Sequence, residues 1–484
     1  MGLARLALNC HFSRQCFVTT GVCSNVIGIG CIVGFPGVLL PQLHVPGSAI
    51  KPSKEMESWI ASVLAISMFF GNFMTPPIMD RLGRRIAHFS VTLPILTGWL
   101  ATIFATNSEA LLAGRILQGI GLGMMQPLRC ALLGEYASPR HRGGFLATIA
   151  LAQGFGILLV HTLGSYLSFQ HTAAISLSFS LISLVITTYS PESPSWLATV
   201  GQYDKCREVF LWLRGKDETP ELEKMIEASK QRTNDKKRFK DVLNVAQKKE
   251  FYKPVFLMFA VYIMMNFSGP ILFATYSTVV LQLLMGPEID APFWMVAFDV
   301  QRLIFNTGAV YVINRTSRRT MMFATGALCA GSHLAQSGYI FAKSNQYLPF
   351  DSLWIPGILV SLQVLSFAVG MIPLPNVIAG EVYPLQYRSL AGCVSVVASS
   401  ASIFLVLKTF PALIFSVGLQ GVYLLHSGVI SAGLVVVWFL LPETKGKTLQ
   451  EIEECFRGKP FELEGGKELE TLNRTEEEKM LDKC

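Results

Sequence analysis

Long, mostly apolar runs alternate with short polar connections along nearly the whole chain. A hydrocarbon core about 30 Å thick needs roughly 20 apolar residues of helix to cross it. The runs that reach this length cover residues 17–41, 56–79, 86–106, 110–134, 144–165, 171–190, 254–285, 291–313, 320–342, 352–379, 389–416 and 419–441. The pattern predicts an all-α membrane protein with twelve transmembrane helices.

One long polar segment, residues 191–253, separates six predicted spans from the next six. Thr219 followed by Pro220 fits the start of a helix, so short helices are predicted inside this segment. We therefore predict four parts, which are an N-terminal six-helix bundle (1–190), a cytosolic linker with short helices (191–253), a C-terminal six-helix bundle (254–441) and a cytosolic C-terminal tail (442–484).

A charged connection occurs at the same place in both predicted bundles. The first charged loop reads DRLGRR (Asp80–Arg85) and follows the second span, and the second charged loop reads NRTSRR (Asn314–Arg319) and follows the eighth. This repetition indicates two related halves. Repeated helical bundles are typical of secondary transporters, whose two halves move around a site near the middle of the membrane.

Composition and charge agree with a protein that lies in a bilayer. Hydrophobic residues make up 51% of the chain and charged residues 15%, and the mean hydropathy is +0.44. Lys and Arg gather in the connections after the even-numbered spans, which predicts that these connections and both termini are cytosolic. The net charge of +7 is then a feature of membrane topology, and no nucleic-acid partner is expected.

The sequence gives little support to a metal site, a disulfide framework, a nucleotide-binding loop or an enzyme. The ten cysteines lie mostly inside or beside the apolar runs, without the spacing of a metal site or a disulfide framework. Glycine-rich stretches such as GIGLG (Gly119–Gly123) lie inside apolar helices, where they favour close helix packing and not nucleotide binding. The sequence therefore predicts neither an enzyme nor a bound cofactor or metal.

Six motifs, of which the first charged loop is one, fall in register from the second span to the C-terminal tail. They read DRLGRR (80–85), GRILQGIGLGM (114–124), EYASPRHRG (135–143), PESPSWL (191–197), GEVYPLQYRS (380–389) and PETKGKTLQEIEE (442–454). These motifs resemble the signatures of the sugar porter family of the major facilitator superfamily. LVLKTF (405–410) and a short first outer loop are similar to the arthropod facilitated trehalose and sugar transporters within it.

The resemblance implies a function and its partners. A member of this family is expected to be a monomer in the plasma membrane that carries a hexose or a trehalose-like disaccharide by alternating access, with the solute and the lipid bilayer as its partners. Proton-coupled relatives carry an aspartate in the first span near GFPG, and this chain has no acid from Val18 to His44. Asp299 lies three residues before Arg302 and can pair with it on one helix face, which also favours uniport.

Gating charges are implied at the cytosolic helix ends. In an outward-facing state, the resemblance implies that arginines and glutamates of one half meet those of the other. The candidate gating residues are Asp80, Arg84, Arg85, Glu135, Arg142, Arg318, Arg319, Glu381 and Arg388. Asn314 and Ser317 depart from the acid and the glycine that the family usually carries, so a looser lock is expected. The alternative is that these charges only fix topology or bind lipid headgroups.

Candidate solute ligands come from spans 5, 7, 8, 10 and 11, where the resemblance places a sugar site. They are Gln153, Asn266, Arg302, Asn376 and Ser399. Amides and hydroxyls suit a sugar because each sugar hydroxyl must donate and accept once it leaves water. Arg302 stands where the family has asparagine, and Asn376 where it has tryptophan, so the pocket differs from a glucose pocket. Two alternatives stay open, which are a carrier of another solute such as an organic anion and a transport-inactive sensor.

Overall fold

The computed structural model describes residues 11–215, 218–231, 249–347, 352–383, 388–447 and 449–457, and the regular elements in these ranges are helices. Six long helices form the first half. They are α2 (His11–Leu43), α3 (Lys54–Leu82), α4 (Arg84–Ile103), α5 (Ser108–Tyr136), α6 (Pro139–Tyr166) and α7 (Phe169–Tyr189).

The second half has the same number of passes, but several of its helices are broken or joined. Its elements are α12 (Lys249–Phe267), α13 (Pro270–Met285), α14 (Ala291–Arg315), α15 (Arg318–Ser344), α16 (Trp354–Ser366), η2 (Phe367–Met371), α17 (Pro373–Val382) and α18 (Arg388–Leu440). Helix α18 holds two passes, because Gly418 interrupts it with a φ of 71°.

Nine helical segments within the described ranges are long and apolar enough to cross a membrane. This set counts α12 with α13 and α16 with α17 as single segments, and counts α18 once. The second pass of α18 and the more polar helices α14 and α15 complete the twelve-helix arrangement. The predicted fold class is therefore confirmed.

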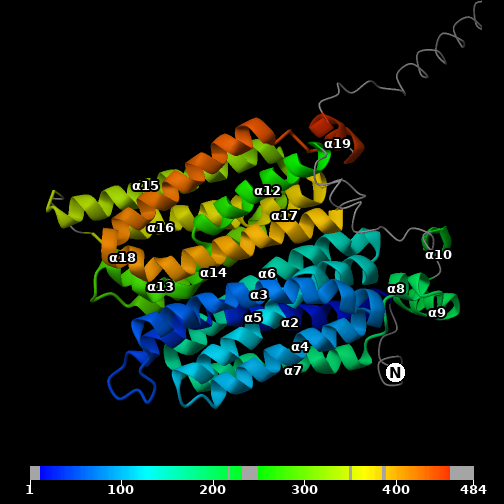
Figure 1. Cartoon of the computed structure of the whole chain (residues 1–484), viewed down its shortest axis with the longest axis horizontal. Coiled ribbons are helices and arrows are strands. Elements are labelled where there is room, and N and C mark those ends of the chain that lie inside the picture. The colour runs from blue at the N-terminus through cyan, green and yellow to red at the C-terminus, as the bar shows by residue number, and fades with distance from the viewer. Residues whose placement is uncertain are drawn as a thin grey trace, which may run out of the picture.

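Short helices lie at one end of the bundle, which we call the linker end (Figure 1). They are α8 (Pro194–Thr199), α9 (Tyr203–Arg214), α10 (Thr219–Gln231) and α19 (Leu449–Arg457). Helix α9 buries Cys206, Phe210 and Leu213 against the first half and is therefore packed onto that half. The other end of the bundle, where α2 joins α3, is called the opposite end. The four segment boundaries given above remain predictions.

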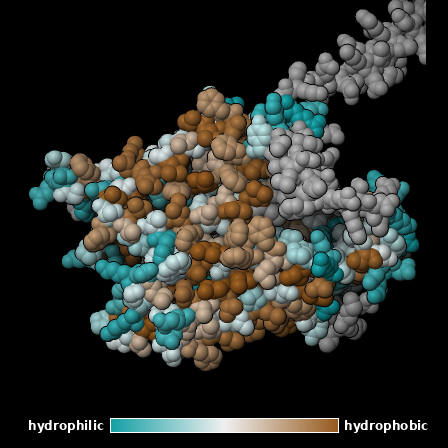
Figure 2. All heavy atoms as spheres, in the orientation of Figure 1, coloured by the Kyte–Doolittle hydropathy of each residue, from teal (hydrophilic) through white to brown (hydrophobic). Residues whose placement is uncertain are grey.

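Each half has its own hydrophobic core, and the two halves lie side by side in Figure 1. In the first half the rings of Phe35 and Trp99 pack edge to face, with 5.1 Å between their centres. In the second half the rings of Phe273 and Phe298 pack in the same way, with 5.9 Å between their centres. A band of apolar side chains covers the outside between polar ends (Figure 2). Such an exposed apolar surface suits contact with lipid, since it is far larger than a soluble monomer leaves in water.

Two spans of the second half are interrupted near their middle. Between α12 and α13, Gly269 has a φ of 99°, and a Cβ there would lie 2.4 Å from the Nε2 of Gln363, so glycine is required on both grounds. In the other span, the π-helical turn η2 precedes Pro373, which cannot donate a backbone hydrogen bond. Irregular backbone at membrane depth is found where it is buried in protein or lines a cavity.

Candidate functional site

Several contacts join the two halves toward the opposite end of the bundle. The Thr278 hydroxyl donates to the carbonyl oxygen of Gly37 at 3.2 Å, and the Ser58 hydroxyl donates to that of Lys408 at 3.2 Å. The Lys408 ammonium also lies 4.0 Å from the centre of the Trp59 ring. These contacts join α2 and α3 to α13 and α18, so the structure is closed at the opposite end.

His161 of α6 forms the most buried link between the halves. Its Nδ1 lies 2.5 Å from Oδ2 of Asp299 on α14, and its Nε2 lies 3.1 Å from two main-chain oxygens, those of Gly34 on α2 and Ala274 on α13. The side chains of His161 and Asp299 are 0% and 2% exposed. One imidazole therefore contacts its own half through Gly34 and the other half through Ala274 and Asp299.

Asp299 also pairs with Arg302, as the spacing of the two residues predicts. An Arg302 guanidinium nitrogen, Nη2, lies 3.2 Å from Oδ1 of Asp299, and Arg302 is 4% exposed. The pair offsets a buried positive charge that would otherwise cost several kcal/mol, by the usual penalty for moving an ion out of water. Arg302 remains a predicted solute ligand, and it shares the Asp299 carboxylate with His161.

Asn266 and Ser399, both predicted ligands, are brought together between α12 and α18. The Asn266 amide donates to the Ser402 hydroxyl at 2.7 Å and to the main-chain oxygen of Ser399 at 3.2 Å. Asn266 is 2% exposed, so this amide is held in place by the second half itself. The two residues offer an amide and a hydroxyl at one location.

The other predicted ligands have different partners. Gln153 of α6 accepts a hydrogen bond from Arg129 of α5 at 3.3 Å, within the first half. Asn376 is exposed and donates to the carbonyl of Ile372, one turn back, at 3.4 Å. The structure thus joins Asn266 to Ser399 and leaves Gln153, Arg302 and Asn376 bonded elsewhere. Their role as solute ligands stays a prediction.

At the linker end, the first charged loop is tied to its own half. Arg84 donates from Nη2 to Glu135 at 2.9 Å and from Nε to both carboxylate oxygens of that residue. The backbone N–H of Arg84 donates to Glu192 at 2.8 Å, and that of Arg85 donates to the same carboxylate at 3.2 Å. Glu192 therefore caps the N-terminus of α4, where backbone N–H groups lack helical partners.

The second charged loop repeats this arrangement in the other half. Arg318 donates from Nη2 to Glu381 at 3.1 Å. The backbone N–H groups of Arg318 and Arg319 donate to the Glu443 carboxylate at 2.9 and 3.1 Å. Glu443 thus caps α15 as Glu192 caps α4. Each half therefore carries the same set of contacts at the linker end, which we call its brace. The brace consists of Arg84, Glu135 and Glu192 in the first half and of Arg318, Glu381 and Glu443 in the second.

The structure gives partners for some of the gating residues predicted from the sequence. Among the side chains that the structure describes, Glu135 and Glu381 pair with Arg84 and Arg318 of their own halves. Asp80 is 74% exposed and reaches Arg84 only at 4.0 Å. Arg85 and Arg319 bind the main-chain oxygens of Thr187 and Trp438, and the side chains of Arg142 and Arg388 lie outside the described residues. Pairing across the halves was expected for an outward-facing state and remains a prediction.

The two capping carboxylates differ in their acidity. Burial raises the pKa of Glu192 above its ordinary value, despite backbone hydrogen bonds from Ser193, Arg85 and Arg84. Burial acts in the same direction on Glu443, but the backbone hydrogen bonds from Lys445, Arg318 and Arg319 outweigh it, so that its pKa is lowered. The brace of the second half therefore keeps its negative charge to lower pH.

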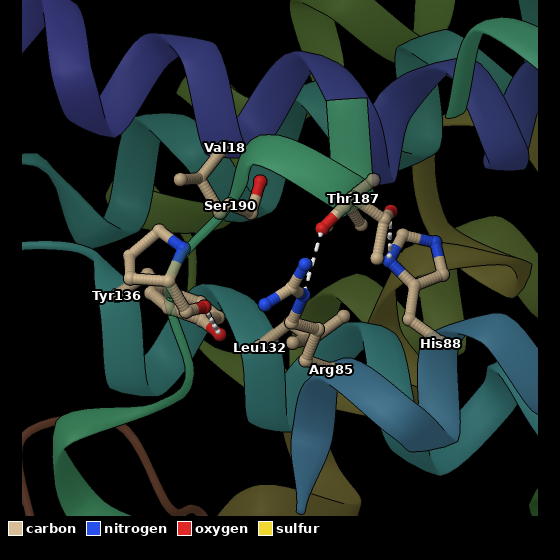
Figure 3. A pocket seen from close by; sticks show the side chains of 9 residues that line it. Val18, Arg85, His88, Leu132, Tyr136, Thr187 and Ser190 are labelled. Atoms are coloured by element: carbon tan, nitrogen blue, oxygen red, sulfur yellow. Dashed lines mark hydrogen bonds between the residues drawn. The ribbon is translucent and has the colours of Figure 1, made fainter. Parts of the chain in front are cut away.

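A small cavity at the linker end of the first half is shown in Figure 3. Its lining includes Arg85, His88, Tyr136 and Thr187, with hydrogen bonds from Arg85 to the Thr187 carbonyl and between the Thr187 hydroxyl and His88. The space is roughly that of one water molecule, which is too small for a sugar. This cavity belongs to the packing of α4 against α5 and α7 and is not a solute site.

Two six-helix bundles, each with its own core and brace, define a transporter of the major facilitator class. Residues 18–456 match the family described as sugar (and other) transporter, and the chain belongs to that family. It is similar to the facilitated trehalose transporter Tret1 of Apis mellifera ligustica, with 27% identity over 417 residues, 85% of this chain and 82% of the relative. For the protein of the same name from Culex quinquefasciatus, the identity is 28% over 85% of this chain and 80% of the relative.

Solved structures support the fold. The inward-open conformation of the xylose transporter XylE from E. coli has a TM-score of 0.73 at 17% identity and covers 92% of this chain and 100% of that one. The proton:xylose symporter XylE bound to 6-bromo-6-deoxy-D-glucose has a TM-score of 0.70 at 19% identity over 92% and 99% of the two chains. The sequence-based expectations of a sugar porter and of a protein that is not an enzyme are confirmed.

Three residues with clear roles in the structure were not predicted from the sequence. His161 is a single histidine in an apolar run, and its partners Gly34, Ala274 and Asp299 are distant in sequence, so no local pattern indicates the contact. Glu192 and Glu443 do carry a signal. Each follows a proline directly after the last span of its half, in PES and PET, and this repetition could have identified them as equivalent.

Proposed function

We propose that this protein moves a sugar, a hexose or a trehalose-like disaccharide, down its gradient by alternating access. One structural observation supports the proposal above the others. Each half is braced within itself at the linker end, while the hydrogen bonds named above that join the halves, among the residues that the structure describes, lie toward the opposite end. Two rigid halves joined in this way can separate at one end and close at the other, which is how repeated bundles carry a solute.

The proposed orientation places the linker end in the cytosol. Lys and Arg are concentrated in the connections at that end, and positive residues close to helix ends resist translocation. Both termini are then cytosolic, and the structure, which is closed at the opposite end, represents a state closed to the outside. The proposed location is the plasma membrane, and the proposed form is a monomer.

The residues that face the interior favour a neutral polyhydroxylated solute over an anion. Asn266, Ser399 and Gln153 provide amides and a hydroxyl, and such groups can both donate to and accept from sugar hydroxyls. Arg302 is the residue that favours an organic anion. Asp299 lies 3.2 Å from its guanidinium and pairs with it, which weakens the case for an anionic solute.

Uptake into proteoliposomes tests the proposal. Vesicles containing the purified protein are compared with empty vesicles for entry of labelled glucose, xylose, trehalose and a set of small organic acids. Saturable entry of at least one sugar, above the leak of empty vesicles, is the expected result. Entry of an organic acid with none of the sugars would contradict the proposal, and so would vesicles that take up no solute more quickly than the empty ones.

A further inference from the structure

The imidazole of His161 faces hydrogen-bond acceptors on both of its ring nitrogens. The carbonyl oxygens of Gly34 and Ala274, both 3.1 Å from Nε2, can only accept, so Nε2 must carry a hydrogen to bond with either. On the other side, Nδ1 lies 2.5 Å from a carboxylate oxygen of Asp299, and a hydrogen must lie between these two atoms for the contact to be attractive.

Counting hydrogens shows that this site holds one more proton than a neutral histidine beside an ionised aspartate. A neutral imidazole has a single N–H, which serves either Nε2 or Nδ1. With the hydrogen on Nε2, a bare Nδ1 lone pair would face the Asp299 carboxylate at 2.5 Å. With the hydrogen on Nδ1, a bare Nε2 would face two carbonyl oxygens. Only the added proton, on His161 or on Asp299, satisfies every contact.

We propose that His161 and Asp299 form a proton-binding latch that holds the opposite end closed, and that opening of this end releases the proton. The two residues belong to different halves, α6 and α14, so separating the halves breaks their contact. The proton then loses its shared position and exchanges with water. Their side chains, 0% and 2% exposed, are closed to water in the structure described here, so a proton bound in this state is trapped until the opposite end opens.

Arg302 is the charged residue next to the latch, and it pairs with Asp299. From Gln15 to Leu43, α2 has no charged residue and offers the Gly34 carbonyl, and α13 has none either and offers that of Ala274. On α5, Arg115 binds the main-chain oxygens of Ile32 and Ile60 and the side chain of Gln118, whereas Arg129 binds Gln153. The remaining titratable group of α13, the hydroxyl of Tyr276, donates to the Leu407 carbonyl, and His171 of α7 bonds to Ser168.

The latch makes the conformational equilibrium depend on pH in one direction. The closed state binds one proton more than the open state, so acid favours closure and alkali favours opening. In the range where one proton is released on opening, the ratio of open to closed molecules rises by up to about tenfold for each pH unit. The proton is taken up and released on the same side, so the latch changes the rate of transport without driving it.

Distances between spin labels at the opposite end test the proposal directly. Val45 lies between α2 and α3 and is 56% exposed, and Glu288 lies between α13 and α14 and is also exposed. Cysteines at these two positions, in a chain whose native cysteines are replaced by alanine or serine, carry the labels. Double electron–electron resonance is recorded on samples frozen between about pH 5 and pH 8, the range in which histidine charge changes.

The parent should show a growing population of longer distances as the pH rises. His161→Gln keeps an N–H donor for the two carbonyls but cannot titrate, and it should abolish the dependence on pH. Asp299→Asn should do the same, because its amide can donate to Nδ1 without an added proton. His88→Gln is the matched control, since His88 is buried within the first half and bonds Ser183 and Thr187, and its variant should respond to pH as the parent does.

Two results would overturn the latch. One is a parent whose distances do not change with pH, and the other is a pH response that persists in His161→Gln. The proposal rests on the alternating opening proposed above but not on the identity of the solute. If the distances respond to added sugar and not to pH, alternating access stands and the latch is wrong. If the opposite end stays closed at every pH and with every sugar, both fail.

Discussion

Glu192 and Glu443 occupy equivalent positions in the two halves, because each carboxylate accepts hydrogen bonds from the backbone N–H groups of two consecutive arginines. These are Arg84 and Arg85 in the first half and Arg318 and Arg319 in the second. The equivalence extends to the side-chain pairs behind them, Arg84 with Glu135 and Arg318 with Glu381. The duplication seen in the sequence is therefore a duplication of structure at the linker end.

The two caps should differ in their contribution to stability. The pKa of Glu443 is lowered, so its ionised form stabilises the fold above its unfolded pKa, and this contribution is lost as the pH falls through the folded value. The pKa of Glu192 is raised, so burial disfavours its ionised form at neutral pH. At about pH 7, Glu443→Gln should cost on the order of 1 kcal/mol, and Glu192→Gln should cost less. Thermal unfolding of both variants in detergent measures this, and equal losses would contradict it.

The side-chain pair of the first brace gives a second prediction. Glu135→Gln leaves the half-buried guanidinium of Arg84 without its carboxylate and should lower stability by on the order of 2 kcal/mol. Glu227→Gln on the exposed face of α10 is the control and should change stability by less than about 0.5 kcal/mol. The unfolding midpoints of both are compared with the parent. A Glu135→Gln protein as stable as its control would show that the pair contributes only topology.

Gly269 provides a test of the broken seventh span. An alanine there would place its Cβ 2.4 Å from Gln363 Nε2 at a φ of 99° and should cost about 1–3 kcal/mol. Gly331→Ala, in helix α15, is matched in chemistry, and nothing lies within 4 Å of the added Cβ. It should be neutral or slightly stabilising, because alanine favours a helix more than glycine does. Similar yields and unfolding midpoints for both variants would argue against the break described here.

Asn266 is the predicted ligand whose environment makes the clearest case for solute binding. Asn266→Leu removes an amide next to Ser399 and Ser402 and should raise the Michaelis constant for sugar at least about tenfold, or abolish uptake, at unchanged surface expression. Asn25→Leu is the control, because the Asn25 amide bonds Thr92 inside the first half. Parent-like uptake kinetics in Asn266→Leu would show that the solute binds elsewhere.

The sequence alone predicts those features that depend on short-range patterns. Twelve apolar runs identify the passes, and the three-residue spacing predicts the pair between Asp299 and Arg302, because i and i+3 share a helix face. His161 could not be predicted in this way. Its partners come from three other helices, and two of them are main-chain oxygens that any residue could supply.

The partners of the charged loops also could not be predicted from local sequence patterns. The sequence shows that Glu135 and Glu381 are charged and lie near helix ends, but which arginine each meets depends on how the halves are tilted. In this structure both pair within their own halves. The solute ligands are the hardest part, since Gln153, Arg302 and Asn376 have partners of their own and only Asn266 and Ser399 come together.

Counterflow in proteoliposomes tests the central claim, alternating access for a sugar, most directly. Vesicles loaded with a high concentration of unlabelled sugar are diluted into a trace of the same labelled sugar, without a pH or ion gradient. The account predicts a transient excess of label inside over the equilibrium level, since returning carriers are loaded by the internal sugar and labelled molecules enter in exchange. Saturable entry of label that never exceeds equilibrium, at any internal concentration of any sugar tested, would contradict it.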